Sequence, residues 1–251
     1  MKKFRKLILE EVLFVDKTDN VLELKGVETF IGQYHILFGV DLKIKKGQAT
    51  VLLGRNGGGK TTTLETIVGL RQPSAGSIIF DGEDVTKLEA HTMVQKGIGY
   101  VPEDRDIFSD LTIEENLIIS FRKNGGNYKE RLDMILSLFP DMKKYFKKKA
   151  RVLSGGQAQM LSISRALIND NKLILIDEPS KGLAPIIISE LIDRLNEIKK
   201  TSTILLVEQN YEMATAIGDY FYFIDDGKTE FECTREELLK DDSIKQKYLG
   251  V

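Results

Sequence analysis

The chain contains a single cysteine, Cys233, among its 251 residues, which excludes an internal disulfide and any cysteine-rich zinc site. Its formal net charge of −2 leaves no positive excess, so the composition gives no indication of nucleic-acid binding. No apolar run approaches the roughly 20 residues that a helix needs to span a bilayer. The hydrophobic share of 42% and the charged share of 29% are typical of a globular domain.

Residues 1–15 combine positive charges with an apolar stretch, as a signal peptide does. However, Glu10 and Glu11 interrupt the apolar stretch, and no small-residue cleavage site follows it. We therefore expect residues 1–20 to form a short N-terminal extension, and we expect a cytoplasmic location.

Strand-like and helix-like segments alternate along most of the remaining sequence. Val, Ile and Leu predict strands at residues 21–27, 35–54, 172–177, 202–208 and 220–225. Helical spacing predicts helices at residues 59–70 and 185–200, and Asp81-Gly82 predicts the turn of a hairpin. This alternation predicts an α/β fold with a mostly parallel sheet covered by helices.

Residues 111–165 interrupt the alternation with a largely helical pattern. We expect them to form a helical subdomain inserted into the α/β core. One domain over residues 21–251 would then have a core made of residues 21–110 and 166–251.

A glycine-rich stretch, residues 54–62, lies between a predicted strand and a predicted helix and satisfies the pattern G-x-x-x-x-G-K-[ST]. Its glycines allow successive N–H groups to point inward, and the helix N-terminus adds partial positive charge. The residues of this phosphate cradle are Gly54, Arg55, Asn56, Gly57, Gly58, Gly59, Lys60, Thr61 and Thr62. We expect Lys60 to reach the β- and γ-phosphates and Thr61 to ligate Mg²⁺. The alternative is a glycine-rich turn without a ligand.

Two carboxylates, Asp177 and Glu178, end the apolar strand predicted at residues 172–177. Ligands of open α/β sheets sit at such strand ends. We expect Asp177 to hold Mg²⁺ through water and Glu178 to act as the base that polarises the attacking water. The alternative is that both residues only cap the following turn.

The stretch Leu153-Ser154-Gly155-Gly156-Gln157 opens a second helix with a serine and free backbone N–H groups, so it is a second candidate anion site. Together with the cradle, it resembles the ABC-type ATPases over roughly residues 21–251. The resemblance implies that two subunits pack head to tail, each ATP lying between one cradle and the other subunit's signature, residues 153–157. It also implies a P-loop NTPase (RecA-like) core with an N-terminal antiparallel β subdomain and an inserted α-helical subdomain.

Four further features narrow the resemblance. Glu103 stands where most ABC ATPases carry glutamine, and Gln209 stands where most carry histidine. The run Gly182-Leu183-Ala184-Pro185 replaces a Gly-Leu-Asp run, and the chain ends in Tyr-Leu-Gly-Val. Together these features resemble the F-type ATPase subunit of branched-chain amino-acid ABC importers.

The resemblance assigns further residues to the site. Gln209 would contact the γ-phosphate as a second catalytic residue, and Glu103 becomes a third candidate for the Mg²⁺ site with Thr61 and Asp177. Ile31 occupies the position before a glycine where an aromatic residue usually stacks on adenine. An aliphatic side chain there forfeits stacking, which is worth up to about 1–1.5 kcal/mol.

The partners are also implied by the resemblance. We expect a G-type ATPase subunit in a heterodimer, or a homodimer in isolation, with two membrane permeases at the cytoplasmic face. An external substrate-binding protein would act indirectly, and no nucleic acid is expected. The open alternatives are another substrate, such as urea, another amide or a lipid, and a nucleic-acid- or ribosome-associated ABC ATPase.

A permease helix is expected in a groove beside residues 103–111, where Phe108 and Leu111 are apolar residues in a polar loop. The alternative is that both side chains pin the loop to the core. We interpret residues 143–151 as a solvated basic face rather than a lipid contact. Cys233 is interpreted as a packed small residue rather than a reactive thiol.

Overall fold

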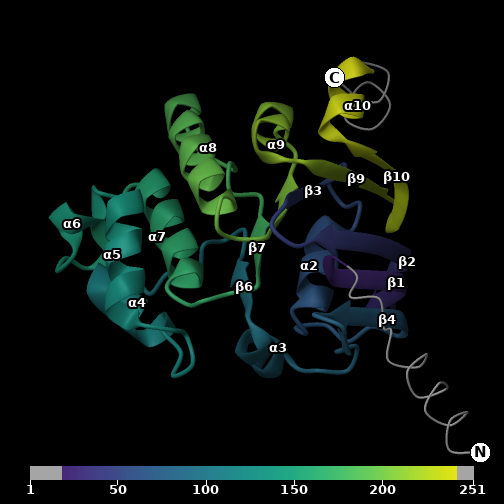
Figure 1. Ribbon diagram of the computed structural model, residues 1–251, viewed down its shortest axis with the longest axis horizontal. Helices are drawn as coiled ribbons and strands as arrows, with labels where there is room; N and C mark the ends of the chain where they lie inside the picture. Colours follow the sequence, from purple (N-terminus) through teal and green to yellow (C-terminus); the bar gives the residue numbers. More distant parts are fainter. Residues whose placement is uncertain (1–18, 242–251) are drawn as a thin grey trace, which may run out of the picture.

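The computed structural model describes residues 19–241 as two β-sheets and an arm of helices (Figure 1). The expectations for most of the N-terminal extension and for the C-terminal Tyr-Leu-Gly-Val lie outside the described residues. Figure 1 shows the antiparallel sheet at the right, the larger sheet in the centre and the helical arm at the left.

The larger sheet has the strand order β10-β9-β3-β8-β7-β6, and all neighbours are parallel except β10 and β9. Its strands are β3 (Ala49–Leu53), β6 (Ile98–Val101), β7 (Leu173–Asp177), β8 (Ile204–Glu208), β9 (Tyr220–Asp225) and β10 (Lys228–Thr234). In β8, Ile204 and Leu206 face one hydrophobic core, whereas Leu205 and Val207 face the other. Because both faces are buried, the strand is a continuous apolar run instead of an alternating one.

The smaller sheet is antiparallel, with the order β2-β1-β4-β5. Its strands are β1 (Asn20–Ile31), β2 (Tyr34–Lys45), β4 (Ala75–Phe80) and β5 (Glu83–Asp84). Asp81 and Gly82 form the turn between β4 and β5 with φ of 51° and 81°. Positive φ at both positions favours Asp-Gly, so the predicted hairpin is confirmed.

Helices cover both faces of the larger sheet or form the arm. The helices of the core are α2 (Lys60–Ile67), α3 (Ala90–Lys96), α8 (Pro185–Lys199), α9 (Tyr211–Ile217) and α10 (Arg235–Lys240). The arm contains α4 (Ile113–Ser120), α5 (Tyr128–Leu138), α6 (Met142–Tyr145), a 3₁₀ turn (Ala150–Val152) and α7 (Gly155–Leu167). The division into subdomains at residues 111 and 165 stays a prediction, and α7 itself continues two residues beyond it.

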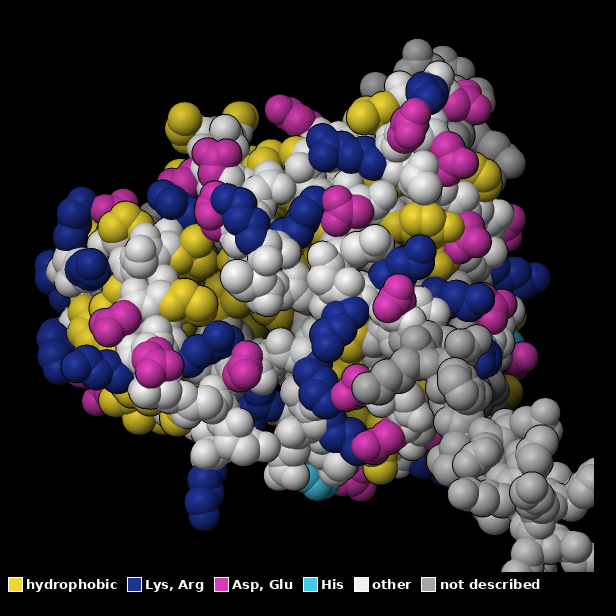
Figure 2. All heavy atoms as spheres, in the orientation of Figure 1, with side chains coloured by type: hydrophobic (Ala, Val, Ile, Leu, Met, Phe, Trp, Pro, Cys, Tyr) yellow, Lys and Arg dark blue, Asp and Glu magenta, His cyan; other side chains and the backbone are white. Residues whose placement is uncertain are grey.

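Acidic and basic side chains are interspersed on the face shown in Figure 2, and hydrophobic side chains gather over the arm. Within residues 19–241, no helix is both long enough and apolar enough to cross a membrane.

Candidate active site

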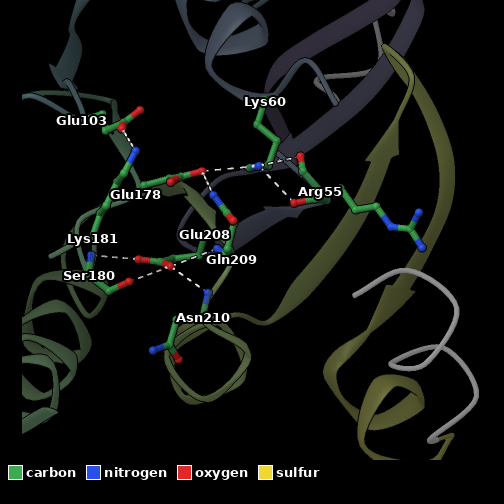
Figure 3. A network of polar contacts seen from close by, with 10 residues as sticks. Arg55, Lys60, Glu103, Glu178, Ser180, Lys181, Glu208, Gln209 and Asn210 are labelled. Atoms are coloured by element: carbon green, nitrogen blue, oxygen red, sulfur yellow. Dashed lines mark hydrogen bonds and ion pairs between the residues drawn. The ribbon is translucent and has the colours of Figure 1, made fainter. Parts of the chain in front are cut away.

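Three adjacent strands bring the candidate residues to one edge of the parallel sheet. β3, β8 and β7 run parallel, so their carboxyl ends meet there. Gly54 follows β3, Gln209 follows β8 and Glu178 follows β7. Residues far apart in the sequence therefore lie around one site, as expected for an α/β sheet (Figure 3).

The cradle needs glycine for two different reasons. Gly59 precedes α2 with φ of 101°, a left-handed conformation, and no side chain caps the first turn of this helix. Gly54 passes so close to β9 that a Cβ there would lie 2.1 Å from the carbonyl oxygen of Ile224. Lys60 is buried, and its Nζ donates to the carbonyl oxygens of Gly54 and Arg55, at 3.0 Å each. The lysine is thus held against the backbone of the cradle.

A cavity of about 320 Å³ opens beside Lys60. Its lining residues are Ile31, Ile36, Asn56, Gly57, Gly59, Lys60, Thr61, Thr62, Glu103, Glu178 and Lys181. Gly54 and Gly58 are buried against Ile224 of β9, Arg55 points to solvent, and Asp177 is fully buried. Gln209 is exposed and reaches the site through Glu178. A larger cavity, of about 520 Å³ between α5 and α8, contains none of these residues.

The side chain of Glu178 contacts Lys60 from the cradle after β3 and Gln209 from the loop after β8. Its Oε1 accepts a hydrogen bond from Nε2 of Gln209 at 2.5 Å and lies 3.4 Å from Nζ of Lys60. Its backbone is left-handed, with φ of 41°. Such strain in a residue with a side chain persists only where its surroundings hold it, and it is frequent at functional sites. The geometry suits a carboxylate that is aimed at a ligand of the cavity.

Asp177 is buried without a hydrogen-bond partner for either carboxylate oxygen in the described part of the chain. Burial raises the pKa of this carboxyl to about 6, against the lowering effect of the nearby Thr61 hydroxyl. The negative charges of Glu178 and Glu103 also raise it. Leaving buried oxygens unpaired is costly, so Asp177 is a strong candidate to face a cation.

The oxygen atoms of Thr61 and Asp177 fit the ligand preference of Mg²⁺, which uses one or two protein ligands together with substrate phosphates. Glu103 lines the same cavity, but here its carboxylate is paired with Lys181. Among residues 19–241, no three His, Cys, Asp or Glu side chains form a cluster suited to a metal.

Three residues of the site were not predicted from the sequence. Ile36 and Lys181 line the cavity, and Glu208 lies behind it, where it accepts hydrogen bonds from Ser180. Glu208 carried a signal, because it is an acidic residue at the end of an apolar strand, as Asp177 is. Ile36 and Lys181 carried none, since only the folded chain brings them to the cradle.

The signature lies outside this cavity. Ser154 caps α7: its Oγ accepts from the N–H of Gln157 at 3.3 Å, and Oε1 of Gln157 accepts from the N–H of Ser154 at 3.0 Å. Ser154 and Gly155 are exposed and Leu153 is half-buried. Gly156 packs against the side chain of Ile187 in α8. None of these residues lines the cavity of Lys60. The chain therefore presents a capped helix start away from its own cradle.

Residues 37–181 match the ABC transporter family. The chain is 39% identical to the high-affinity branched-chain amino acid transport ATP-binding protein BraG of Pseudomonas aeruginosa, over 92% of this chain and 100% of that protein. It is 37% identical to the probable branched-chain amino acid transport ATP-binding protein LivF of Archaeoglobus fulgidus, over 87% of this chain and 94% of that protein. The lipopolysaccharide export system ATP-binding protein LptB of Haemophilus influenzae is 33% identical, over 84% and 89%.

A solved structure of an ATP-binding cassette of an ABC transporter, in its ADP conformation, superposes with a TM-score of 0.77 and 26% identity. The superposition covers 93% of this chain and 100% of that one. The expected ABC ATPase fold, with its antiparallel β subdomain, is thereby confirmed. The resemblance to ATP-binding proteins of branched-chain amino acid transport is confirmed by the two relatives of that description. The chain belongs to the ABC transporter family, as an ATP-binding subunit with ATPase activity.

Proposed function

We propose that this chain is the F-type ATPase subunit of an importer for branched-chain amino acids. The observation that carries the motor role is the separation of two half-sites. One is the cavity of Lys60 and Glu178, with Gln209 hydrogen-bonded to Glu178, and the other is the signature of residues 153–157, which is exposed at Ser154 and Gly155. Each half-site would be completed by the opposite half-site of a second subunit. The similarity to BraG and LivF supports the substrate class.

In the proposed mechanism, Lys60 exchanges its two carbonyl partners for the β- and γ-phosphate oxygens of ATP. Glu178 takes the proton of the water that attacks the γ-phosphorus, and ADP leaves as its bond to that phosphorus breaks. Gln209 orients Glu178 through their hydrogen bond, and its second amide N–H would donate to the γ-phosphate. Mg²⁺, held by Thr61 and Asp177, would supply neutralisation of phosphate charge. ATP binding would close the dimer, because a second subunit's signature binds the phosphates, and this closure would exclude bulk water. Hydrolysis would remove the bridging phosphate and reopen the dimer.

Adenine would be covered by aliphatic side chains. Ile31 and Ile36 both line the cavity, whereas the neighbouring Phe30 stacks on His35, with ring centroids 4.1 Å apart. Tyr34 is exposed and lies outside the cavity lining. The base would then be held by contact area instead of by ring stacking.

The permease helix would dock in a third cavity, of about 390 Å³, between the core and the arm; we name it the groove. Its lining includes Leu70 and Val94 of the core, Arg105 and Asp106 of the loop after β6, and Arg122 and Arg165 of the arm. Of the expected contacts, Phe108 and Leu111 do not line it. Because the groove joins the loop that begins at Glu103 to the arm, movement of the arm would be transmitted to a bound permease.

The test is reconstitution of this chain with the permeases and binding protein encoded beside it. Leucine, isoleucine and valine should stimulate ATP hydrolysis and be taken up, whereas urea and amides should do neither. A neighbourhood without a periplasmic-type amino-acid-binding protein, or stimulation by lipid alone, would favour the second candidate, a lipid transporter like the system of LptB.

A further inference from the structure

An acidic residue that takes no part in the proposed chemistry ends the central strand of the site. Glu208 closes β8, which lies between β3 and β7, and only 1% of the residue is exposed. Carboxylates are almost never buried to this extent unless they are paired. Burial raises the pKa of this carboxyl, while the hydrogen bonds that it accepts oppose the rise.

Four neutral donors surround the Glu208 carboxylate (Figure 3). The backbone N–H of Ser180 donates to Oε1 at 3.0 Å, and the Ser180 hydroxyl donates to Oε2 at 2.9 Å. The backbone N–H groups of Gln209 and Asn210 also donate to Oε2, at 3.0 Å each. One side chain thus connects the loop after β7 with the loop after β8.

These two loops carry the two candidate catalytic side chains. Ser180 lies two residues after Glu178, and Gln209 directly follows Glu208. The hydrogen bond between Glu178 and Gln209 therefore spans two backbones that Glu208 already holds together. The left-handed backbone of Glu178 needs such support, because nothing in its own sequence favours φ of 41°.

We propose that Glu208 is a positioning residue for ATP hydrolysis, whose carboxylate clamps the loop after β7 to the loop after β8 and so aligns Glu178 with Gln209. The proposal rests on the proposed roles of Glu178 and Gln209. Glu208 does not line the cavity, so it acts on the reaction only through these two residues.

The variant Glu208→Gln tests the proposal, because it keeps the size of the side chain but replaces one acceptor oxygen with a donor. In the full-length chain assembled with its partner subunit, we expect kcat to fall about 10- to 100-fold, as misplacement of catalytic groups by an ångström does. The Kd for a fluorescent ATP analogue, measured with Mg²⁺, should stay within about threefold, because the cradle is untouched.

Glu237→Gln is the matched control. Glu237 also accepts a backbone N–H, from Thr234 at 2.8 Å, but at the start of α10. The Glu237→Gln variant should leave kcat and the Kd for the ATP analogue unchanged. Glu178→Gln is measured in parallel: if it retains normal hydrolysis, the proposed base is wrong, whatever Glu208→Gln shows.

An unchanged kcat for a folded Glu208→Gln would overturn the clamp. So would parallel losses of kcat, ATP affinity and thermal stability, since these indicate a purely structural role. If Glu208→Gln does not fold, Ser180→Ala decides, because it removes one of the four hydrogen bonds and spares the backbone. The clamp predicts a smaller fall in kcat with unchanged Kd, and an unchanged kcat for Ser180→Ala then rejects it.

Discussion

Glu178 shows how the properties of one residue depend on distant parts of the chain. Its carboxylate meets Lys60 from the cradle and Gln209, 31 positions later, while its own backbone is held in a left-handed conformation. None of these contacts is local. A substitution at this residue should therefore affect the hydrolysis step much more than the binding of ATP, which depends on the cradle.

Glu178→Gln is expected to preserve Mg²⁺-dependent ATP binding and to trap a closed, ATP-loaded dimer. Loss of a general base typically costs about 10²- to 10⁴-fold in rate. Single-turnover hydrolysis and gel filtration with ATP would measure both effects. Normal hydrolysis by this variant in the assembled complex would show that another group is the base.

Cys233 should react slowly with alkylating reagents. It is 3% exposed, and burial raises the pKa of its thiol to about 11, with a smaller effect from the charge of Glu237. Since the thiolate is the nucleophile, labelling of the native protein at pH 8 should be much slower than labelling in urea.

The pH dependence of Cys233 has a definite sign. Its folded pKa lies above the ordinary value of 9.0, so its contribution to stability is complete below about pH 9 and is lost as the pH rises through about 11. In the labelling experiment the control is Cys233→Ser, which has no thiol to react. Rapid labelling of the native protein at pH 8 would contradict the interpretation of Cys233 as a buried thiol with a raised pKa.

The sequence predicted the cradle, Asp177 and Glu178 because each depends on a local pattern: a glycine spacing, or acids at the end of an apolar strand. Lys181 and the four-donor arrangement around Glu208 were missed, because they arise from the packing of separate loops. The contribution of Ile36 to the cavity likewise depends on how β2 lies against the cradle.

Among the elements, the loop between β6 and α4 is held in place by a side chain of α4. Asn116 of α4 is fully buried; its Oδ1 accepts from the N–H of Phe108 at 2.9 Å, and its Nδ2 donates to the carbonyl oxygen of Phe108 at 3.0 Å. The loop is thus fixed through its backbone. The ring of Phe108 is left 48% exposed, with the Arg165 guanidinium 4.8 Å from its centre.

Phe108→Asp should therefore reduce transport while leaving ATP affinity intact, because the half-exposed ring lies on Arg165 at the edge of the groove and the loop does not need the ring for anchoring. Uptake in the reconstituted transporter and ATP binding would be measured together. Leu239→Asp is the control, because Leu239 is another exposed large apolar residue, on α10. Parallel loss of binding and uptake would instead mean that Phe108 stabilises the loop.

Long elements with strong patterns were predicted well, as β7, β8 and α8 show. Local sequence patterns did not predict α3, β6, α9, β10 and α10, which are short or, in the case of β10, mostly exposed. A four-residue strand such as β6 is defined by pairing with β7, so its own sequence carries little information.

At the scale of the whole molecule, the chain offers two incomplete sites. ATP-binding subunits of ABC transporters function as dimers with membrane permeases. With a G-type partner, one composite site would combine Lys60, Glu178 and Gln209 with the partner's signature. The other would combine the partner's catalytic residues with residues 153–157 of this chain.

We expect these two sites to hydrolyse ATP at unequal rates, with the site of Gln209 slower. Glutamine donates a hydrogen bond but cannot become cationic as histidine can, so it stabilises developing charge less well. Glu178→Gln should leave substantial turnover, whereas the equivalent change in the partner should abolish most of it. Equal losses, or a Gln209→His variant with unaltered hydrolysis at this site, would show that both sites are equivalent.

The position of β3 between β8 and β9 has a consequence for biosynthesis. The ribosome makes the cradle early, but Gly54 rests on Ile224, and the carbonyl of Gly58 accepts a hydrogen bond from the N–H of Gly227 at 3.1 Å. Translation at about 5–20 residues per second separates these contacts by roughly 10 to 30 s. During that interval a nascent chain has the whole phosphate-binding motif but lacks residues 224–227, which pack against it in the folded protein. We therefore expect ATP to stabilise the finished domain more than it stabilises early folding intermediates.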